Sequence, residues 1–226
     1  MKIIDDIQKI NILIKSNDLE NVFNQNRNGI QIRIYDKDEF IMKKGMKSDY
    51  LYFLIKGNLK VDPISIHNKV AMVDYIKPID VLGEFEFFSN KETIQSIYAI
   101  TKVTILAISY SELNHAYTNN VDFYKFLSYL LAQKLEHSSS RYSESILHPL
   151  KYRIASFLIH ESKYADNVEI SINISKTAES FGCDVRHFRR ILQEFENEGF
   201  IKRNQKAKTV IILKPKSFEK ALDSYQ

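Results

Sequence analysis

Three arginines follow a candidate helix-capping aspartate in the last third of the chain. They are Arg186, Arg189 and Arg190, and they come directly after Asp184. An aspartate at this position caps a helix by accepting hydrogen bonds from the free N–H groups of its first turn. A guanidinium group forms paired hydrogen bonds with the edge of guanine, so arginines on the first turns of a helix are suited to reading a DNA groove. The pattern therefore predicts nucleic-acid recognition for this segment.

The residues around these arginines predict two short helices joined by a tight turn. Asn173 is a suitable N-cap for the first helix, and Ala178 is small enough to let two helices cross closely. Gly182 can take the left-handed conformation that ends this helix. The apolar residues that would anchor the second helix, at helical spacing, are Phe188, Ile191, Leu192 and Phe195. The opposite face, which we expect to contact bases, carries Val185, Arg186, Arg189 and Arg190.

A basic β-hairpin is predicted after Gly199, with a polar turn over residues 204–208. Basic side chains in such a hairpin can rest on the DNA backbone. The residues that we expect to contact phosphates, in the helices and in the hairpin, are Lys176, His187, Lys202, Arg203, Lys206 and Lys208. An alternative stays open, in which the arginines only solvate an exposed helix face and pair with Glu194 and Glu196.

The positive charge of the chain is concentrated in the same region. The net formal charge is +4, and residues 149–226 hold 14 Lys and Arg against 10 Asp and Glu. The first 148 residues hold 18 of each. A basic segment on a neutral body is typical of a nucleic-acid-binding domain, although a surplus of four charges can also arise by chance.

The composition is that of an ordinary globular protein. Apolar residues make up 44% and charged residues 27% of the chain, which argues against disorder. No stretch approaches the roughly 20 apolar residues of a membrane span, and the N-terminus lacks the apolar region of a signal peptide. The only cysteine is Cys183, which excludes an intramolecular disulfide and an all-cysteine metal cage. We therefore expect a cytoplasmic protein with no membrane partner.

Catalysis is not expected from this sequence. The histidines are scattered, and they form no metal triad and no activated nucleophile with a neighbouring acid. We accordingly expect no enzyme activity, no metal and no cofactor.

Short strands dominate the predictions between residues 29 and 109. Alternating or apolar runs, separated by turn signals, cover residues 30–34, 50–55, 69–73 and 96–108. This spacing predicts an antiparallel β-roll, preceded by a helical segment within residues 1–28.

A long helix is predicted after the strands. Residues 121–147 contain no Gly or Pro, Asn119 or Asn120 can cap the helix, and Pro149 ends it. The fold class is thus α+β. It has a β-roll domain with its N-terminal helix (1–119), a long helix (120–148) and a DNA-binding domain (149–226).

The long helix carries apolar residues that suggest pairing with a second copy of itself. This dimer seam consists of Tyr124, Leu131, Leu135 and Tyr142, with Ser128 and Ser138 at the same spacing. A second stripe, which includes Phe123 and Leu127, can pack on the β-roll instead. Both uses are expected, although packing on the β-roll alone remains an alternative.

The sequence resembles the Crp/Fnr regulator superfamily. Residues 182–192 with 198–201 resemble its winged helix-turn-helix, and residues 40–57 and 78–84 resemble its cyclic-nucleotide-binding β-roll. The resemblance covers nearly the whole chain in the order β-roll, dimer helix, hinge and winged helix, and it is closest to the YeiL-like branch. It implies a bacterial transcription regulator that acts as a homodimer.

The resemblance also implies an effector pocket, and here the sequence departs from the family pattern. In members that bind cyclic AMP, a Gly-Glu pair holds the ribose and an arginine about ten residues later neutralises the phosphate. Gly83 and Glu84 are present, but residues 93–96 contain no cation. A buried phosphate without its arginine loses a charge-assisted contact, so we do not expect cyclic AMP as the effector. Candidate pocket residues for another molecule are Gly83, Glu84, Thr93, Gln95, Ser138 and Ser139.

For Gly83 and Glu84, a tight turn with a capping carboxylate is the alternative explanation, and it is the one that we favour. The hypothesis is a homodimer that binds double-stranded DNA at a near-palindromic site and reorients about a hinge near His148. RNA polymerase would be a further partner of an activator, and the small-molecule effector is unknown. The alternative is a small-molecule sensor whose winged helix mediates protein contacts.

Overall fold

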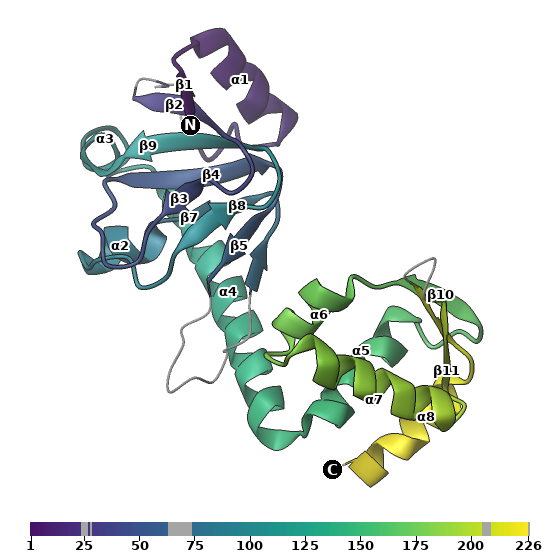
Figure 1. Cartoon of the computed structure of the whole chain (residues 1–226). Helices are drawn as coiled ribbons and strands as arrows, with labels where there is room; N and C mark the ends of the chain where they lie inside the picture. The colour runs from purple at the N-terminus through teal and green to yellow at the C-terminus, as the bar shows by residue number, and fades with distance from the viewer. Residues whose placement is uncertain (24–26, 28, 63–73, 205–208, 226) are drawn as a thin grey trace. The chain divides into compact units, whose positions relative to one another are not determined.

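A computed structural model describes residues 1–225 except 24–26, 28, 63–73 and 205–208 (Figure 1). The described chain divides into two compact units, and the division falls after Leu135. The long helix α4 (Val121–Leu147) contributes residues to both units. The predicted domain limits at residues 119 and 148 remain predictions. Among the described residues, no helix has both the length and the hydropathy that crossing a membrane requires.

The first unit contains two antiparallel sheets. The five-stranded sheet has the order β1-β2-β9-β4-β7, with strands Lys2–Ile4, Ile30–Tyr35, Val103–Ser109, Tyr50–Lys56 and Asp80–Leu82. The four-stranded sheet has the order β3-β8-β5-β6, with strands Phe40–Met42, Ile97–Ala99, Leu59–Val61 and Asp74–Ile76. This is the predicted antiparallel β-roll.

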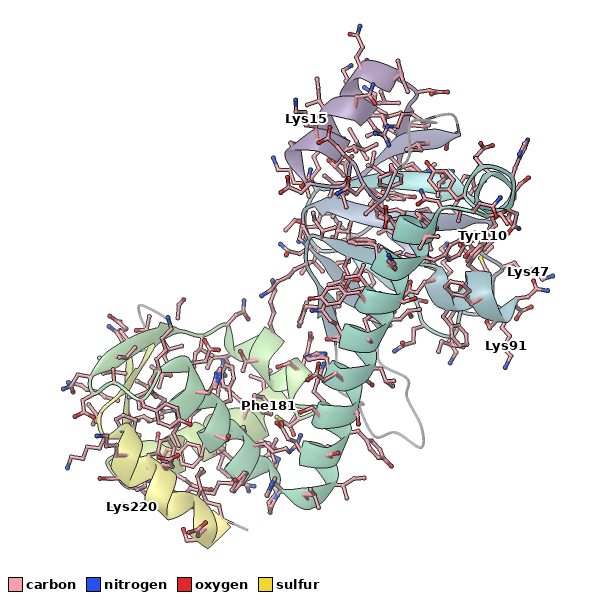
Figure 2. All side chains as sticks on the ribbon, turned by 180° about the vertical axis from the view of Figure 1, so that it is seen from behind. Lys15, Lys47, Lys91, Tyr110, Phe181 and Lys220 are labelled. Atoms are coloured by element: carbon pink, nitrogen blue, oxygen red, sulfur yellow. The ribbon has the colours of Figure 1, made fainter. Side chains whose placement is uncertain are left out.

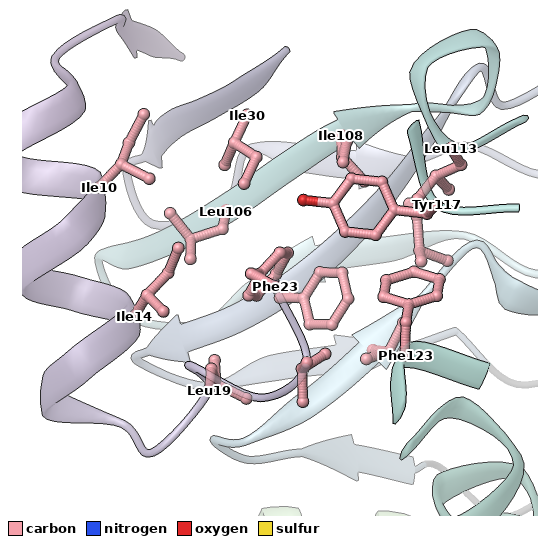
Figure 3. Packing of buried hydrophobic residues seen from close by; sticks show 14 of the residues in the cluster. Ile10, Ile14, Leu19, Phe23, Ile30, Leu106, Ile108, Leu113, Tyr117 and Phe123 are labelled. Atoms are coloured by element: carbon pink, nitrogen blue, oxygen red, sulfur yellow. The ribbon is translucent and has the colours of Figure 1, made fainter. Parts of the chain in front are cut away.

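Side-chain alternation along β4 separates two hydrophobic cores. Leu51 and Phe53 face one core, to which α1 (Ile7–Ser16), α3 (Tyr110–Ala116) and the start of α4 contribute. Phe23, which Figure 3 labels, lies in this core. Its ring centroid is 4.7 Å from that of Phe53. Leu54 and its neighbours face the second core, which draws residues from both sheets. The period-two alternation of the strand residues therefore determines which side chains face each core of the β-roll.

The N-terminal segment differs from the predicted helical segment over residues 1–28. The helix α1 covers only Ile7–Ser16, where Asp6 caps it, and Lys2–Ile4 pairs with β2 as an edge strand. Pairing with the sheet satisfies the backbone groups of this strand, so a tertiary contact overrides loose helical spacing.

The run predicted over residues 96–108 is two strands in different sheets. β8 ends at Ala99 and β9 begins at Val103. In the turn between them, the hydroxyl of Thr101 accepts a hydrogen bond from the backbone N–H of Asn58. The run at residues 69–73 lies outside the described residues. Two short helices were not anticipated: α2 (Glu84–Ser89) and α3.

The second unit contains helices around a three-stranded sheet. After α4 come α5 (Leu150–Glu161), β10 (Val168–Ser171), α6 (Ile174–Ser180), α7 (Val185–Asn197), β11 (Ile201–Asn204), β12 (Thr209–Ile212), α8 (Pro215–Ala221) and η1 (Leu222–Tyr225). The sheet order is β10-β12-β11, and β10 was not anticipated. The two helices and the hairpin predicted for the DNA-binding domain are present.

Candidate nucleic-acid interface and effector site

The helices α6 and α7 of the second unit begin at the N-caps that the sequence predicts. Asn173 accepts a hydrogen bond from the backbone N–H of Lys176 at 3.1 Å, and Asp184 accepts one from His187 at 2.8 Å. The hydrogen bond from His187 also holds the pKa of Asp184 below its ordinary value. Between the helices, Gly182 has a φ of 67°, the left-handed conformation that lets α6 end and α7 begin.

The core positions fix which side of α7 faces outward. Phe188, Leu192 and Phe195 are fully buried, and Phe181 of the preceding turn stacks on Phe188 (Figure 2). Because these residues share one side, Arg186, Arg189 and Arg190 are exposed on the other. The remaining predicted base contact, Val185, is half-buried and packs against the core, so little of it is available to a partner.

The acids that could neutralise these arginines are mostly engaged elsewhere. Arg190 has one contact, 4.0 Å from Nε to an oxygen of Glu194, and its side chain remains 69% exposed. Glu194 also lies 3.3 Å from Lys151. Within the described part of the chain, neither Arg186 nor Arg189 has a carboxylate at ion-pair distance. The geometry favours an outward-facing cationic helix over a self-neutralised one.

The guanidinium of Arg203 is bonded within the protein. Its Nε lies 2.8 Å from the carboxylate of Glu196, its NH2 donates to the same oxygen at 2.7 Å, and it also bonds to Gln193. Its side chain is only 15% exposed. Arg203 therefore links the hairpin to α7, and its role as a phosphate contact stays a prediction.

The other predicted phosphate contacts are placed as follows. Lys176 and Lys202 are exposed, and His187 is half-buried. Lys206 and Lys208 lie outside the described residues.

In the first unit, the predicted Gly83–Glu84 pair begins the short helix α2. Gly83 has a φ of 90°, and its carbonyl accepts a hydrogen bond from the hydroxyl of Tyr110 at 2.7 Å (Figure 2). A Cβ at this position would lie 2.6 Å from the carbonyl oxygen of Tyr50, so only glycine fits.

The carboxylate of Glu84 forms an ion pair within the protein. It lies 2.6 Å from the ammonium of Lys134 on α4, which also lies 3.0 Å from Asp80 and donates to the carbonyl of Val81. Burial alone would lower the pKa of Lys134, but Glu84 and Asp80 outweigh it and raise that pKa. Sequence reasoning missed Lys134, although it continues the inward stripe of Phe123 and Leu127 at helical spacing.

The remaining predicted pocket residues have the following surroundings. Thr93 is buried, and its backbone bonds to Gly45 and Met46. Gln95 donates to the carbonyl of Asp62 at 3.3 Å. Ser138 and Ser139 are exposed on the part of α4 that belongs to the second unit. No group of three His, Cys, Asp or Glu residues in the described chain is arranged to hold a metal ion.

Replacing Lys134 by methionine is expected to destabilise the protein by about 1–3 kcal/mol, because the change leaves Glu84 and Asp80 without their partner. The expected destabilisation is smaller than for a fully buried ion pair, because the side chain of Lys134 is 34% exposed and solvent weakens the interaction. Urea unfolding at neutral pH measures it.

Since the pKa of Lys134 is raised above 10.5 in the folded protein, this stabilisation is fully present below pH 10.5 and is lost as the pH rises through the raised value. Lys125→Met is the matched control, because Lys125 is 74% exposed on the same helix and lies 3.9 Å from Asp122. An equal loss in both variants would contradict the role assigned to Lys134.

Comparison with known proteins bears on both units. The family model described as "Cyclic nucleotide-binding domain" matches residues 32–120. The cAMP-activated global transcriptional regulator CRP of Pasteurella multocida is 26% identical over 188 residues, covering 80% of this chain and 89% of the relative. The chain is therefore similar to Crp/Fnr-type regulators over most of its length, and residues 32–120 match the cyclic nucleotide-binding domain. Regulation of transcription is the function given for the CRP relative.

More distant likenesses agree with the Crp/Fnr fold. The regulatory protein YeiL of Escherichia coli O157:H7 is 20% identical over 168 residues, covering 74% of this chain and 75% of that protein. The c-di-GMP-responsive regulator CLP of Xanthomonas campestris has a TM-score of 0.68 at 19% identity, covering 82% of this chain and 94% of that structure. A Crp/Fnr-family regulator from Eubacterium rectale has a TM-score of 0.64 at 17% identity, covering 97% and 95%. At such identities the two structures establish the fold alone.

Proposed function

We propose that the protein is a homodimeric, sequence-specific DNA-binding transcription regulator that cyclic AMP does not control. The observation that carries the proposal is the capped helix α7, whose three arginines are exposed while its apolar side is buried. An exposed cationic helix of this kind fits the major groove, where arginine distinguishes guanine from other bases. Arg186 and Arg190 would read bases, and Lys176, His187 and Lys202 would hold phosphates.

Dimerisation is supported by the exposed apolar residues of α4. Leu135 is 71% and Tyr142 68% exposed, so both large apolar side chains are available to a partner. They stand seven residues apart, as do Val121 and Ser128 before them, and this is the repeat of paired helices. Tyr124 and Leu131, the other seam residues, are half-buried. A two-fold pair of α7 helices would then meet half-sites about 34 Å apart.

Independence from cyclic AMP is supported by where the cations of the first unit lie. Residues 93–96 offer none, and Lys134 is held between Glu84 and Asp80. Arg33 is 7% exposed, with its guanidinium stacked 3.7 Å from the ring centroid of Tyr50 and bonded to Gln31. A cyclic phosphate beside Glu84 would thus find both Lys134 and Arg33 already engaged within the protein.

Selection of bound sequences from random DNA, followed by titration of the selected site at several salt concentrations, tests the proposal. We expect affinity for DNA to fall steeply with salt, because each phosphate contact releases counterions. We also expect millimolar cyclic AMP to leave the affinity unchanged. If no salt-sensitive DNA retention were found, the alternative of a sensor that makes protein contacts through its winged helix would replace this proposal.

A further inference from the structure

A pocket of about 620 Å³ lies beside α7 in the second unit. Its walls come from residues 172–175 at the start of α6, from one flank of α7 and from the ends of β11 and β12 that face each other. The polar side chains that line it are Asn173, Ser175, Arg189, Arg203, Asn204 and Thr209. None of these lining residues is acidic, while Thr209 bonds to the carboxylate of Glu169 and Arg203 to that of Glu196.

Only one of the two arginines in this wall has an uncommitted charge. Arg203 is held by Glu196, at 2.7 Å from NH2, and the pair is close to neutral. Arg189 is exposed, and in the described chain no carboxylate lies at ion-pair distance from it. The guanidinium of Arg189 is therefore the group that gives the pocket its preference for an anion.

The residues that line the pocket include Arg189 but not the other two arginines of α7. Arg189 and Leu192 line the pocket, whereas Arg186 and Arg190 do not. Successive residues on a helix are about 100° apart, so Arg190 leaves α7 well round from the pocket, on the side of Glu194. The sequence analysis predicted that all three arginines contact bases. In the structure, one of the three lines the pocket and the other two do not.

We propose that this pocket is a phosphate-binding site with Arg189 as its cation, and that it receives a backbone phosphate of DNA. The inference rests on the DNA-binding function proposed above. Arg189, with the hydroxyl of Ser175 across the pocket, positions the protein on the backbone, and base discrimination is left to Arg186 and Arg190. This revises the sequence-based assignment of Arg189 as a base contact.

The first test compares Arg189→Ala with Arg190→Ala on the selected site and on a scrambled site. We expect Arg189→Ala to weaken binding to both sites by the same factor, about 3- to 10-fold, and to reduce the slope of log affinity against log salt by about 1. Arg189→Lys keeps the charge and should restore the slope. Lys220→Ala, which removes an exposed cation of α8 outside the pocket, is the control (Figure 2).

A loss of discrimination between the two sites in Arg189→Ala, with the salt slope unchanged, would overturn the inference and leave the DNA-binding function standing. Circular dichroism and thermal unfolding of each variant confirm that it is folded.

The second test asks whether the same chemistry serves a free phosphorylated molecule. Inorganic phosphate is titrated against chloride at equal ionic strength, and the melting temperature of the parent is compared with that of Arg189→Ala. If the parent binds no DNA but phosphate raises its melting temperature in an Arg189-dependent way, the phosphate site stands and the DNA-binding function fails. If the parent binds no DNA and phosphate has no such effect, both are overturned.

Discussion

Arg190→Ala is expected to lower affinity for the selected DNA site by about 5- to 150-fold, the equivalent of about 1–3 kcal/mol for one bidentate base contact. Affinity for scrambled DNA should fall much less, because that binding depends on phosphate contacts and not on base edges. The ratio of the two affinities, measured by fluorescence anisotropy at one fixed salt concentration, is the decisive quantity.

The physical basis of this expectation is the exposure of the Arg190 side chain. Its only ion-pair partner among the described residues, Glu194, is 4.0 Å away and also interacts with Lys151. Such an exposed pair contributes little to stability, so its loss should leave the fold intact. Asn197→Ala, an exposed change farther along α7, is a matched control. An Arg190→Ala protein that bound both DNAs as the parent does would contradict base reading by this residue.

Leu135→Glu is expected to convert the protein to a monomer and to weaken binding to a two-half-site DNA by about 100-fold or more. A charge placed at the centre of the proposed seam would be buried against its own copy, which is unfavourable on both helices. In a dimer, binding of one subunit brings the second subunit close to the other half-site, and a monomer loses this gain in affinity. Sedimentation velocity measures the first effect, and DNA titration measures the second.

Ser140→Glu adds the same charge on the opposite side of α4 and is the control. Because Leu135 is 71% exposed in the single chain, the substitution removes little packing within the chain. Binding of DNA with parental affinity by a Leu135→Glu monomer would contradict the proposed mode of action. A Leu135→Glu protein that remained dimeric would place the seam elsewhere.

Much of the candidate DNA interface could be predicted because its determinants are local. The caps Asn173 and Asp184 and the turn at Gly182 act on residues within a few positions, and all three are observed. The buried side of α7 follows from helical spacing alone, so the outward direction of its arginines follows too. The β-roll strands were predicted for the same reason, since alternation is a property of neighbouring residues.

Charge pairing between distant residues could not be predicted in this way. Lys134 meets Glu84 across 50 positions of sequence, and the pair forms only because α4 packs on the sheet in one register. The engagement of Arg203 by Glu196 likewise depends on how the hairpin folds back on α7. A charged side chain looks the same in sequence whether solvent or a carboxylate faces it.

The sequence by itself determined the capped helix pair and the resemblance to the Crp/Fnr superfamily. The tertiary structure alone decided that Lys2–Ile4 is an edge strand and that Lys134 forms an ion pair with Glu84. It also decided that Arg189 lines a pocket to which Arg190 does not contribute. The reason is physical. Caps, turns and periodicity are set by interactions over a few residues, whereas the surroundings of a charge are set by packing between elements that only the folded chain brings together.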